Sequence, residues 1–327
     1  MSRVHILATG GTIAGAAESS AAASYRPSEV SIDSLIESVA GLRSVANITA
    51  EQFSQHSSQD IGDAVWLQLA QRVNALFDAD AADGVVVTHG TDTAEETGYF
   101  LHLTVQSHRP VVLTGAMRPA TSLSADGPLN LYNAVAVAAD PDARGRGVML
   151  VINDDIHSAR DATKAHTTDV HAFTSPSAGL LGTANFGCLR YFRRPVRAHT
   201  AAAEFAVSRL ASLPRVDVLY AHSGMAADLV RASAAGARGI VIAGTGNGNV
   251  SSDAADALAA AARAGTVVVR STRVGSGDVI RNIEMQDDAL GLVAADQLNP
   301  QKSRVLLQLC LAQGMDRAAV QEAFYRY

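Results

Sequence analysis

Long apolar runs, cysteine and lysine are all scarce in this chain of 327 residues. No apolar stretch approaches the roughly 20 residues that a membrane-spanning helix needs, so a membrane protein is not expected. Cys188 and Cys310 are the two cysteines. They lie in segments that we assign to different domains, so the case for a disulfide is weak and a reducing compartment is compatible with the sequence. The formal net charge is -6 and there is no basic run, which argues against a nucleic-acid partner.

The composition is that of a folded globular protein. Hydrophobic residues make up 48% and charged residues 18%, which argues against disorder. At this length two domains are expected. Arg3 and the small residues from Ala16 to Ser24 give the N-terminus a superficial resemblance to a signal peptide, but the apolar run 4–8 is shorter than the ~7–15 residues required. We therefore expect Met1 to begin the folded chain and a cytoplasmic location, with a periplasmic location as the alternative if a signal peptide was removed.

Short β-branched runs recur along the chain, and each ends in a polar cluster rich in glycine, threonine, asparagine or aspartate. Continuous apolar runs with helical stretches between them are typical of buried parallel strands. We predict an α/β fold: a larger N-terminal domain at 1–190, with a mostly parallel twisted sheet flanked by helices, and a smaller C-terminal α/β domain at 215–327, with a parallel sheet. Residues 191–214 are the expected linker. The predicted strands are 4–8, 84–87, 110–113, 148–152, 239–243 and 266–269.

Three intervening segments have the apolar spacing of helices: 63–77, 94–105 and 253–264. Thr93 and Glu96 have the spacing of a capping box at the start of the second. Gly265 follows the third, where a C′ glycine is favoured. A fourth helix is expected to begin near Lys302, to which we give a structural role.

The polar clusters follow the strands that form the predicted sheets. Open parallel sheets bind ligands outside the carboxyl ends of their strands. Threonine, asparagine and aspartate gathered there predict a site for a small polar ligand, the alternative being that each cluster is merely a turn.

Several familiar motifs are absent. The Gly10-Gly11-x-x-x-Gly15 spacing is neither a dinucleotide fingerprint nor a phosphate loop, and no G-x-S-x-G elbow occurs. His157, His166 and His171 lie close in sequence but lack the spacing of a metal motif. We expect solvated or hydrogen-bonded loop histidines and no metal site.

Hydroxyl nucleophiles remain. Thr12 and Thr91 each follow a predicted strand on a glycine-rich turn, and a threonine hydroxyl attacks only when a base activates it. Asp92 adjoins Thr91. Of the 26 basic residues only two are lysines, and Lys164 follows a strand end. Arginine cannot release its proton whereas a desolvated lysine can act as a base. The alternative for Lys164 is a salt bridge with Asp161.

The motifs around these residues resemble those of the bacterial-type L-asparaginases, in particular the type II branch. Residues 9–15 (TGGTIAG) resemble the first signature of that family, and residues 84–96 (GVVVTHGTDTAEE) resemble the second. The similarity covers nearly the whole chain in order. It continues through 114–133, 161–169, 246–249 (GNGN) and 299–307 (NPQKSRVLL).

The resemblance implies the hydrolysis of L-asparagine to L-aspartate and ammonia, a step of asparagine catabolism, without cofactor or metal. It implies that Thr12 is the nucleophile and that Tyr25 orients it, whereas spacing alone does not decide between Thr12 and Thr91. It also implies a homotetramer built as a dimer of dimers. It further implies that Thr91, Asp92 and Lys164 form the second catalytic group. Ser58, Gln59 and Asp92 would hold the substrate's charged ends, and the backbone at Thr91 and Ala116 would hold the amide. Asn249 and Glu284 would come from a neighbouring subunit.

Four alternatives stay open. Residues 279–282 resemble glutaminase-asparaginases, so L-glutamine is a second candidate substrate, although Gln59 is more typical of the asparagine-preferring branch. An amidotransferase-type subunit would share the fold. A non-catalytic amino-acid binding protein would not need Thr12, Thr91 and Lys164 together. A nucleotide-binding oxidoreductase is disfavoured because the phosphate fingerprint is missing.

Overall fold

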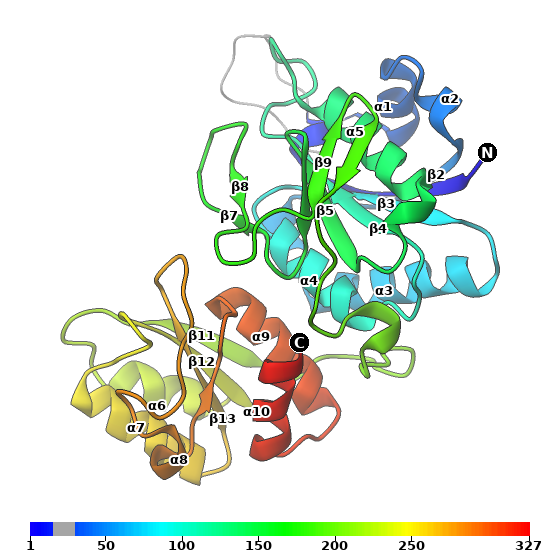
Figure 1. Cartoon of the computed structure of the whole chain (residues 1–327). Helices are drawn as coiled ribbons and strands as arrows, with labels where there is room; N and C mark the ends of the chain where they lie inside the picture. Colours follow the sequence, from blue (N-terminus) through cyan, green and yellow to red (C-terminus); the bar gives the residue numbers. More distant parts are fainter. Residues whose placement is uncertain (16–29) are drawn as a thin grey trace. The chain divides into compact units, whose positions relative to one another are not determined.

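The computed structural model describes residues 1–15 and 30–327, so Tyr25 lies outside the described residues. The chain divides into two compact units, Met1–Ser208 and Arg209–Tyr327 (Figure 1). This division falls within the expected linker, and the linker's first part packs with the first unit. Phe205 and Val207 are buried, and the Val207 carbonyl accepts a hydrogen bond from Gln71 Nε2 at 3.2 Å.

Among the described residues, eight strands form the sheet of the first unit. Five neighbouring strands are parallel, and three at one edge are antiparallel. The predicted mostly parallel sheet is therefore confirmed. In spatial order the strands are β10 (Cys188–Tyr191), β9 (Gly182–Asn185), β6 (Asp155–Ser158), β5 (Val148–Ile152), β4 (Val111–Thr114), β3 (Gly84–Thr88), β1 (Arg3–Gly10) and β2 (Asn47–His56). A separate pair is formed by β7 (Thr163–Lys164) and β8 (Phe173–Thr174).

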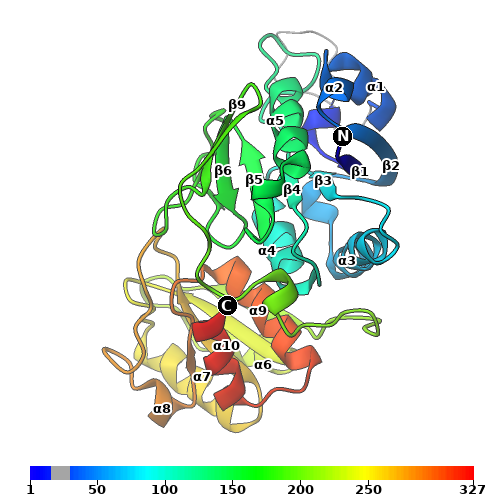
Figure 2. The ribbon, with the colours of Figure 1, turned by 45° about the vertical axis from the view of Figure 1, so that its right-hand side comes forward.

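Helices cover both faces of this sheet, and α5 runs along one of them (Figure 2). That face carries α1 (Ile32–Ser38), α2 (Leu42–Val45) and α5 (Gly127–Ala139), which share one apolar core with alternate strand residues such as Ile6 and Val112. The other face is covered by α4 (Ala94–Thr104), with α3 (Asp63–Asp78) packed on it. Gly98 of α4 lies against Leu113, whose neighbour Val112 points to the opposite core, as expected for alternating strand side chains.

The predicted capping box at the start of α4 is wrong. Thr93 is the N-cap residue but makes no side-chain capping bond. Its Oγ1 instead donates to the carbonyl of Ser58 at 2.7 Å. The hydroxyl therefore ties the start of α4 to another loop.

The second unit is a smaller α/β domain with a parallel sheet in the order β11 (Val216–Tyr220), β12 (Gly239–Gly244), β13 (Val267–Thr272) and β14 (Val293–Ala294). Ile240, Ile242 and Val268 form its core with helix residues such as Leu258. The helices are α6 (Asp228–Ala234), α7 (Ser252–Arg263), α8 (Asp287–Leu290), α9 (Pro300–Ala312) and α10 (Arg317–Arg326).

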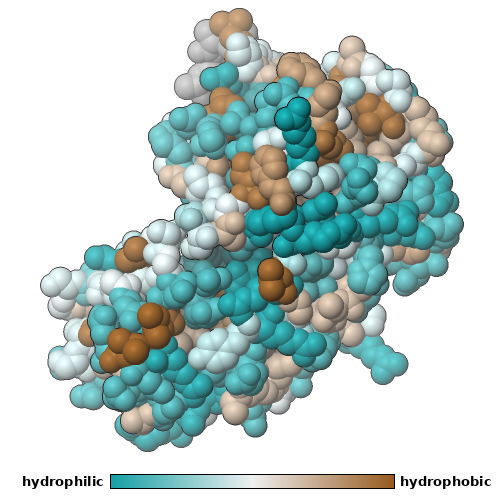
Figure 3. Space-filling view, viewed as in Figure 1, coloured by the Kyte–Doolittle hydropathy of each residue, from teal (hydrophilic) through white to brown (hydrophobic). Residues whose placement is uncertain are grey.

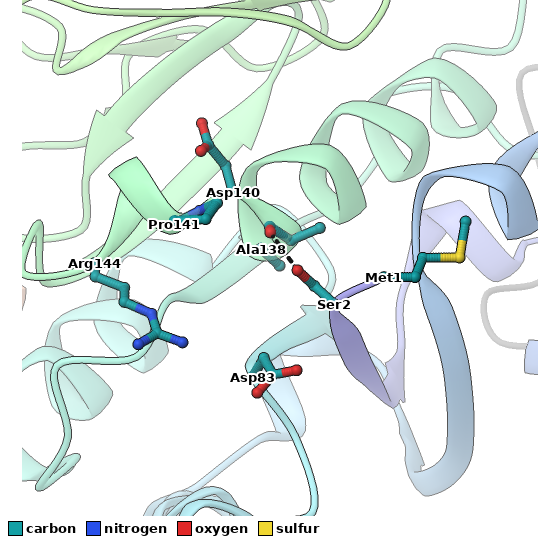
Figure 4. Close-up of a pocket in the computed structure, with 8 residues that line it drawn as sticks. Met1, Ser2, Asp83, Ala138, Asp140, Pro141 and Arg144 are labelled. Atoms are coloured by element: carbon teal, nitrogen blue, oxygen red, sulfur yellow. Dashed lines mark hydrogen bonds between the residues drawn. The ribbon is translucent and has the colours of Figure 1, made fainter.

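One hollow of about 310 Å³ lies in the first unit, where β1 and β3 begin and α5 ends (Figure 4). Asp83 and Arg144 are among its lining residues. Ser2 closes one side, since its Oγ donates to the Ala139 carbonyl at 2.8 Å. Ligands of parallel sheets bind at the opposite, carboxyl edge of the strands, so this hollow is not the predicted site. Within 1–15 and 30–327, no helix is both long and apolar enough to cross a bilayer.

Candidate active site

Six of the predicted site residues lie on loops at the carboxyl ends of four adjacent parallel strands, β4, β3, β1 and β2. In the register of β1 and β3, Ala8 lies opposite Thr88, so the loops that follow start at the same level. The site residues on these loops are Thr12 in the 3-10 helix η1 (Thr12–Ala14), Ser58 and Gln59 in η2 (Ser58–Asp60), Thr91 and Asp92 after β3, and Ala116 after β4.

Glycines allow these loops to approach one another closely. A Cβ on Gly11 would lie 2.4 Å from Gly90 N, and one on Gly90 would lie 2.8 Å from Ser58 Cβ. A Cβ on Gly115 would lie 2.5 Å from the His89 carbonyl oxygen. Gly11 also has φ +84, a conformation that favours glycine. The three glycines therefore bring the four loops into contact.

The side chains gathered there are mostly shielded from water. Thr12, Ser58 and Thr91 are 8%, 4% and 6% exposed, whereas Gln59 is exposed. Ala116 is buried. Two threonine hydroxyls in a shielded position are the expected setting for a nucleophile that works only with a local proton acceptor.

Lys164 reaches this cluster from β7. Its Nζ donates to Thr91 Oγ1 at 2.9 Å and to Asp92 Oδ1 at 2.5 Å, and its side chain is 14% exposed. The alternative salt bridge with Asp161 is wrong. Asp161 pairs instead with Arg160 at 3.2 Å and with Arg193 at 3.0 Å. The lysine therefore joins the same hydroxyl and carboxylate that the sequence singles out.

Glu95 is a residue of this cluster that the sequence analysis missed. It lies in the first turn of α4 and is 6% exposed. Thr163 Oγ1 donates to its Oε2 at 3.0 Å, and the Lys164 amide donates to its Oε1 at 3.4 Å. An acidic residue in a first helical turn is already explained by the helix dipole, so nothing in the spacing pointed to this contact. Glu95 fastens β7, and with it Lys164, to the start of α4.

A buried chain of hydrogen bonds supports the Gly90 carbonyl. Trp66 Nε1 donates to Thr97 Oγ1 at 2.8 Å, Thr97 Oγ1 lies 2.9 Å from His89 Nε2, and His89 Nδ1 lies 2.7 Å from the Gly90 oxygen. A carbonyl only accepts, so Nδ1 carries the proton and Thr97 donates to Nε2. Complete burial lowers the pKa of His89 to about 4, because the charged imidazolium is poorly solvated there. The neutral ring thus fixes the Gly90–Thr91 peptide group, next to Gly11.

Asn249 and Glu284, which the resemblance assigns to a neighbouring subunit's site, are both in the second unit. Asn249 Nδ2 donates to Glu284 Oε2. Asn249 closes the loop after β12 by a two-way backbone pairing with Thr245.

The expectation for the three histidines needs one correction. His157 is not in a loop: it lies buried on β6, and its Nδ1 is 2.9 Å from Ser175 Oγ. His166 accepts a bond from the Asp169 amide at 2.8 Å within a loop. His171 Nε2 lies 3.3 Å from Asp155. In the part of the chain that the structure describes, no group of three or more histidine, cysteine, aspartate or glutamate side chains could hold a metal ion.

Comparison with known proteins identifies the family. The model of the N-terminal asparaginase domain matches residues 3–197, and the model of the glutaminase/asparaginase C-terminal domain matches residues 215–324. The chain belongs to the asparaginase family. The predicted family and enzyme class are thereby confirmed.

Relatives align along nearly the whole chain. A probable periplasmic L-asparaginase of Haemophilus influenzae is 50% identical, over 98% of this chain and 92% of the relative. L-asparaginase 2 of Escherichia coli is 48% identical, over 99% and 93%. A glutaminase-asparaginase of Pseudomonas fluorescens is 45% identical, over 100% and 91%. The crystal structure of a probable cytoplasmic L-asparaginase from Campylobacter jejuni covers 100% of both chains with a TM-score of 0.97 and 46% identity.

Proposed function

We propose that this asparaginase-family enzyme is a hydrolase of L-asparagine that forms L-aspartate and ammonia through a threonine acyl-enzyme. The observation that carries the proposal is the contact of Lys164 Nζ with Thr91 Oγ1 and Asp92 Oδ1, next to the loop that bears Thr12. Thr91 is already bonded to the lysine, which suits a proton relay. Thr12 on the adjoining turn is the proposed nucleophile.

In the proposed reaction, Thr12 Oγ attacks the side-chain amide carbon and the Thr91–Lys164 pair receives the hydroxyl proton. The carbon–nitrogen bond breaks as that proton passes to the leaving amine, which departs as ammonia. Water then attacks the ester, and aspartate leaves with Thr12 restored. Tyr25, by resemblance, orients the nucleophile, and backbone groups at Thr91 and Ala116 hold the amide and its oxyanion.

The substrate's charged ends need complementary groups. Ser58 and Gln59 offer neutral donors for the α-carboxylate, and the carboxylates of Asp92 and Glu284 suit the α-ammonium. L-glutamine is the second candidate substrate, favoured by the 45% identity to a glutaminase-asparaginase. Ammonia release from the two amino acids, measured side by side, decides between one substrate and two.

Thr12→Ala tests the mechanism. We expect turnover to fall by at least ~10³, because a general-base-assisted covalent route is lost, while asparagine still binds. Thr183→Ala on β9, a strand that carries no candidate site residue, is the matched control and should keep its activity. Near wild-type ammonia release by Thr12→Ala would refute the assignment.

We also propose that the enzyme is a homotetramer, a dimer of dimers, in which a neighbouring subunit supplies Asn249 and Glu284. The supporting observation is that Thr12 belongs to the first unit and Glu284 to the second. Thr12→Ala should be nearly inactive alone, and Glu284→Ala should be nearly inactive at asparagine concentrations well below its raised KM. At those concentrations, co-expression should restore part of the activity in mixed assemblies. No recovery in verified mixed assemblies, or full activity in a monomer, would contradict a shared site.

A cytoplasmic location is the remaining proposal. Cys188 and Cys310 are free thiols, which suits a reducing compartment, and the Campylobacter neighbour is described as probably cytoplasmic. The Haemophilus relative is described as periplasmic. Fractionation of the source cells, with activity measured in each fraction, distinguishes the two compartments.

A further inference from the structure

A fully buried ion pair lies in the second unit, beneath the loops that carry Asn249 and Glu284. Arg270 of β13 and Asp287 of α8 are both 0% exposed. Their contact is bidentate, with Nε to Oδ1 and Nη2 to Oδ2 both at 2.7 Å. Burying two charges is costly and is offset only when the remaining polar atoms are also bonded.

Three further hydrogen bonds of the pair go to two irregular segments, 245–249 and 279–284. Arg270 Nη1 donates to the carbonyl of Asn247, and Nη2 donates to the carbonyl of Ile280 at 3.0 Å. Asp287 Oδ2 accepts from the Asn282 amide at 2.8 Å. The guanidinium and its carboxylate therefore fix three backbone positions in two segments that are separate in sequence.

Close packing and a cross-link complete the arrangement. Gly248 has φ +79, and a Cβ there would lie 2.9 Å from Arg270 Nη1, so the first segment rests on the guanidinium. Asn247 Oδ1 accepts from the Ile280 amide at 2.9 Å, which joins the two segments. They terminate at Asn249 and Glu284, whose side chains are hydrogen-bonded to each other.

Apolar packing does little to hold the second segment. Ile280 and Ile283 are 52% and 60% exposed, and Val279 is buried. Apolar residues do reach the surface of this chain in places, as the brown groups in Figure 3 show. With two of its three large apolar side chains in solvent, the segment is held mainly by polar contacts. These are the bonds to the buried pair, the backbone bridge of Val279 with Asp296, and the bonds of Arg281 and Asn282 with Asp288.

We propose that Arg270 and Asp287 are positioning residues for Asn249 and Glu284 and so govern recognition of the substrate's α-ammonium group. This inference rests on the proposed function, in which Glu284 faces that ammonium. Neither Arg270 nor Asp287 touches substrate. Their effect is confined to the binding end, and the Thr12–Thr91–Lys164 chemistry is left intact.

The test compares asparagine with succinamate, which is asparagine without its α-amino group. The variants are Arg270→Lys, which cannot make the bidentate contact, and Asp287→Asn, which keeps the shape but loses the charge. We expect the ratio of kcat/KM for asparagine to that for succinamate to fall at least tenfold, as it should in Glu284→Ala. Most of the change should be in KM.

The matched control is Arg215→Lys. Arg215 makes the same bidentate contact with Asp217, at 2.8 and 2.7 Å, but is 62% exposed. It should leave the ratio unchanged. Asn247→Ala keeps the ion pair and removes only the cross-link to Ile280, so it tests the same idea if the Arg270 and Asp287 variants do not fold. Its ratio should fall in the same direction.

The outcomes separate the inference from the proposed function. A wild-type enzyme without activity on asparagine refutes the proposed function. A wild-type enzyme that is active, with a lowered ratio in Glu284→Ala but an unchanged ratio in folded Arg270→Lys, Asp287→Asn and Asn247→Ala, overturns the positioning role alone. An unchanged ratio in Glu284→Ala overturns the inference together with the assignment of Glu284.

Discussion

Replacing Lys164 by arginine separates two roles that the geometry allows this side chain, a fixed positive charge beside Asp92 and a proton acceptor for Thr91. Lys164 Nζ lies 2.9 Å from Thr91 Oγ1 and 2.5 Å from Asp92 Oδ1, on a side chain that is 14% exposed. Arginine keeps the charge and can still pair with the carboxylate. It cannot release its proton near neutral pH, so it cannot receive one from Thr91.

The expected magnitude follows from the group that is lost. A positioned general base contributes about 10²–10⁴ in rate, equivalent to about 3–5 kcal/mol of activation free energy. If Lys164 is that base, Lys164→Arg should lose most of this factor in kcat for asparagine, with KM changed much less. Lys164→Met, which loses the charge as well, should be no more active than the arginine variant.

The assay is steady-state ammonia release, with thermal unfolding to verify that each variant is folded. Lys302→Arg provides the same chemical change at the chain's other lysine, in the first turn of α9, and should keep kcat at temperatures where it remains folded. The reasoning fails if Lys164→Arg retains most of the wild-type rate while Lys164→Met does not. That pattern would mean that the positive charge alone matters.

Two further predictions concern the supports of the site. Glu95→Gln removes the charge that receives hydrogen bonds from Thr163 and the Lys164 amide. Hydrogen bonds to charged groups contribute about 1.5–3 kcal/mol each, so we expect kcat to fall about 10- to 100-fold. Glu96→Gln is the control, and an unchanged kcat in Glu95→Gln would contradict the positioning role of Glu95. Burial lowers the pKa of His89 in the folded protein to about 4, below the ~6.5 usual for histidine, so the unfolded chain binds a proton that the folded chain excludes. The free energy of unfolding should therefore decline as pH falls from 6.5 to 4, by about 3 kcal/mol from this group. Urea unfolding at pH 7 and 4.5 should show a smaller decline in His89→Gln than in the wild type. An equal decline in the two proteins would refute the lowered pKa of His89.

The sequence predicted those strands whose residues are buried on both faces. The run 84–87 became β3, all of whose residues are buried, because a central parallel strand is apolar throughout. β2 was not predicted: Asn47–His56 is polar and no residue in it is fully buried, since it forms the sheet edge. The two-residue strand β7 is equally invisible to periodicity, although it carries Lys164.

Site residues were predictable where strand ends gather them, and not where a contact joins distant segments. Thr12 and Thr91 follow neighbouring strands, so the topology alone brings their loops together. Glu95 contacts Thr163 across 68 positions of sequence, and no local pattern encodes that distance. Asn249 and Glu284 were assigned by resemblance alone, because their pairing depends on a buried arginine that composition does not mark.

Arginine and lysine serve different chemical roles in this chain, which explains why the composition pointed to Lys164. Where this chain needs a fixed bidentate cation it uses arginine, as in Arg72 with Glu51 at 2.7 and 2.9 Å and in the buried Arg270–Asp287 pair. The planar guanidinium suits a carboxylate but cannot exchange a proton. Lys164 makes its contacts with one carboxylate and one hydroxyl, and a hydroxyl has a proton to give. A lysine retained against such a bias is therefore best explained by proton transfer, and the arginine variant tests that explanation at the atom concerned.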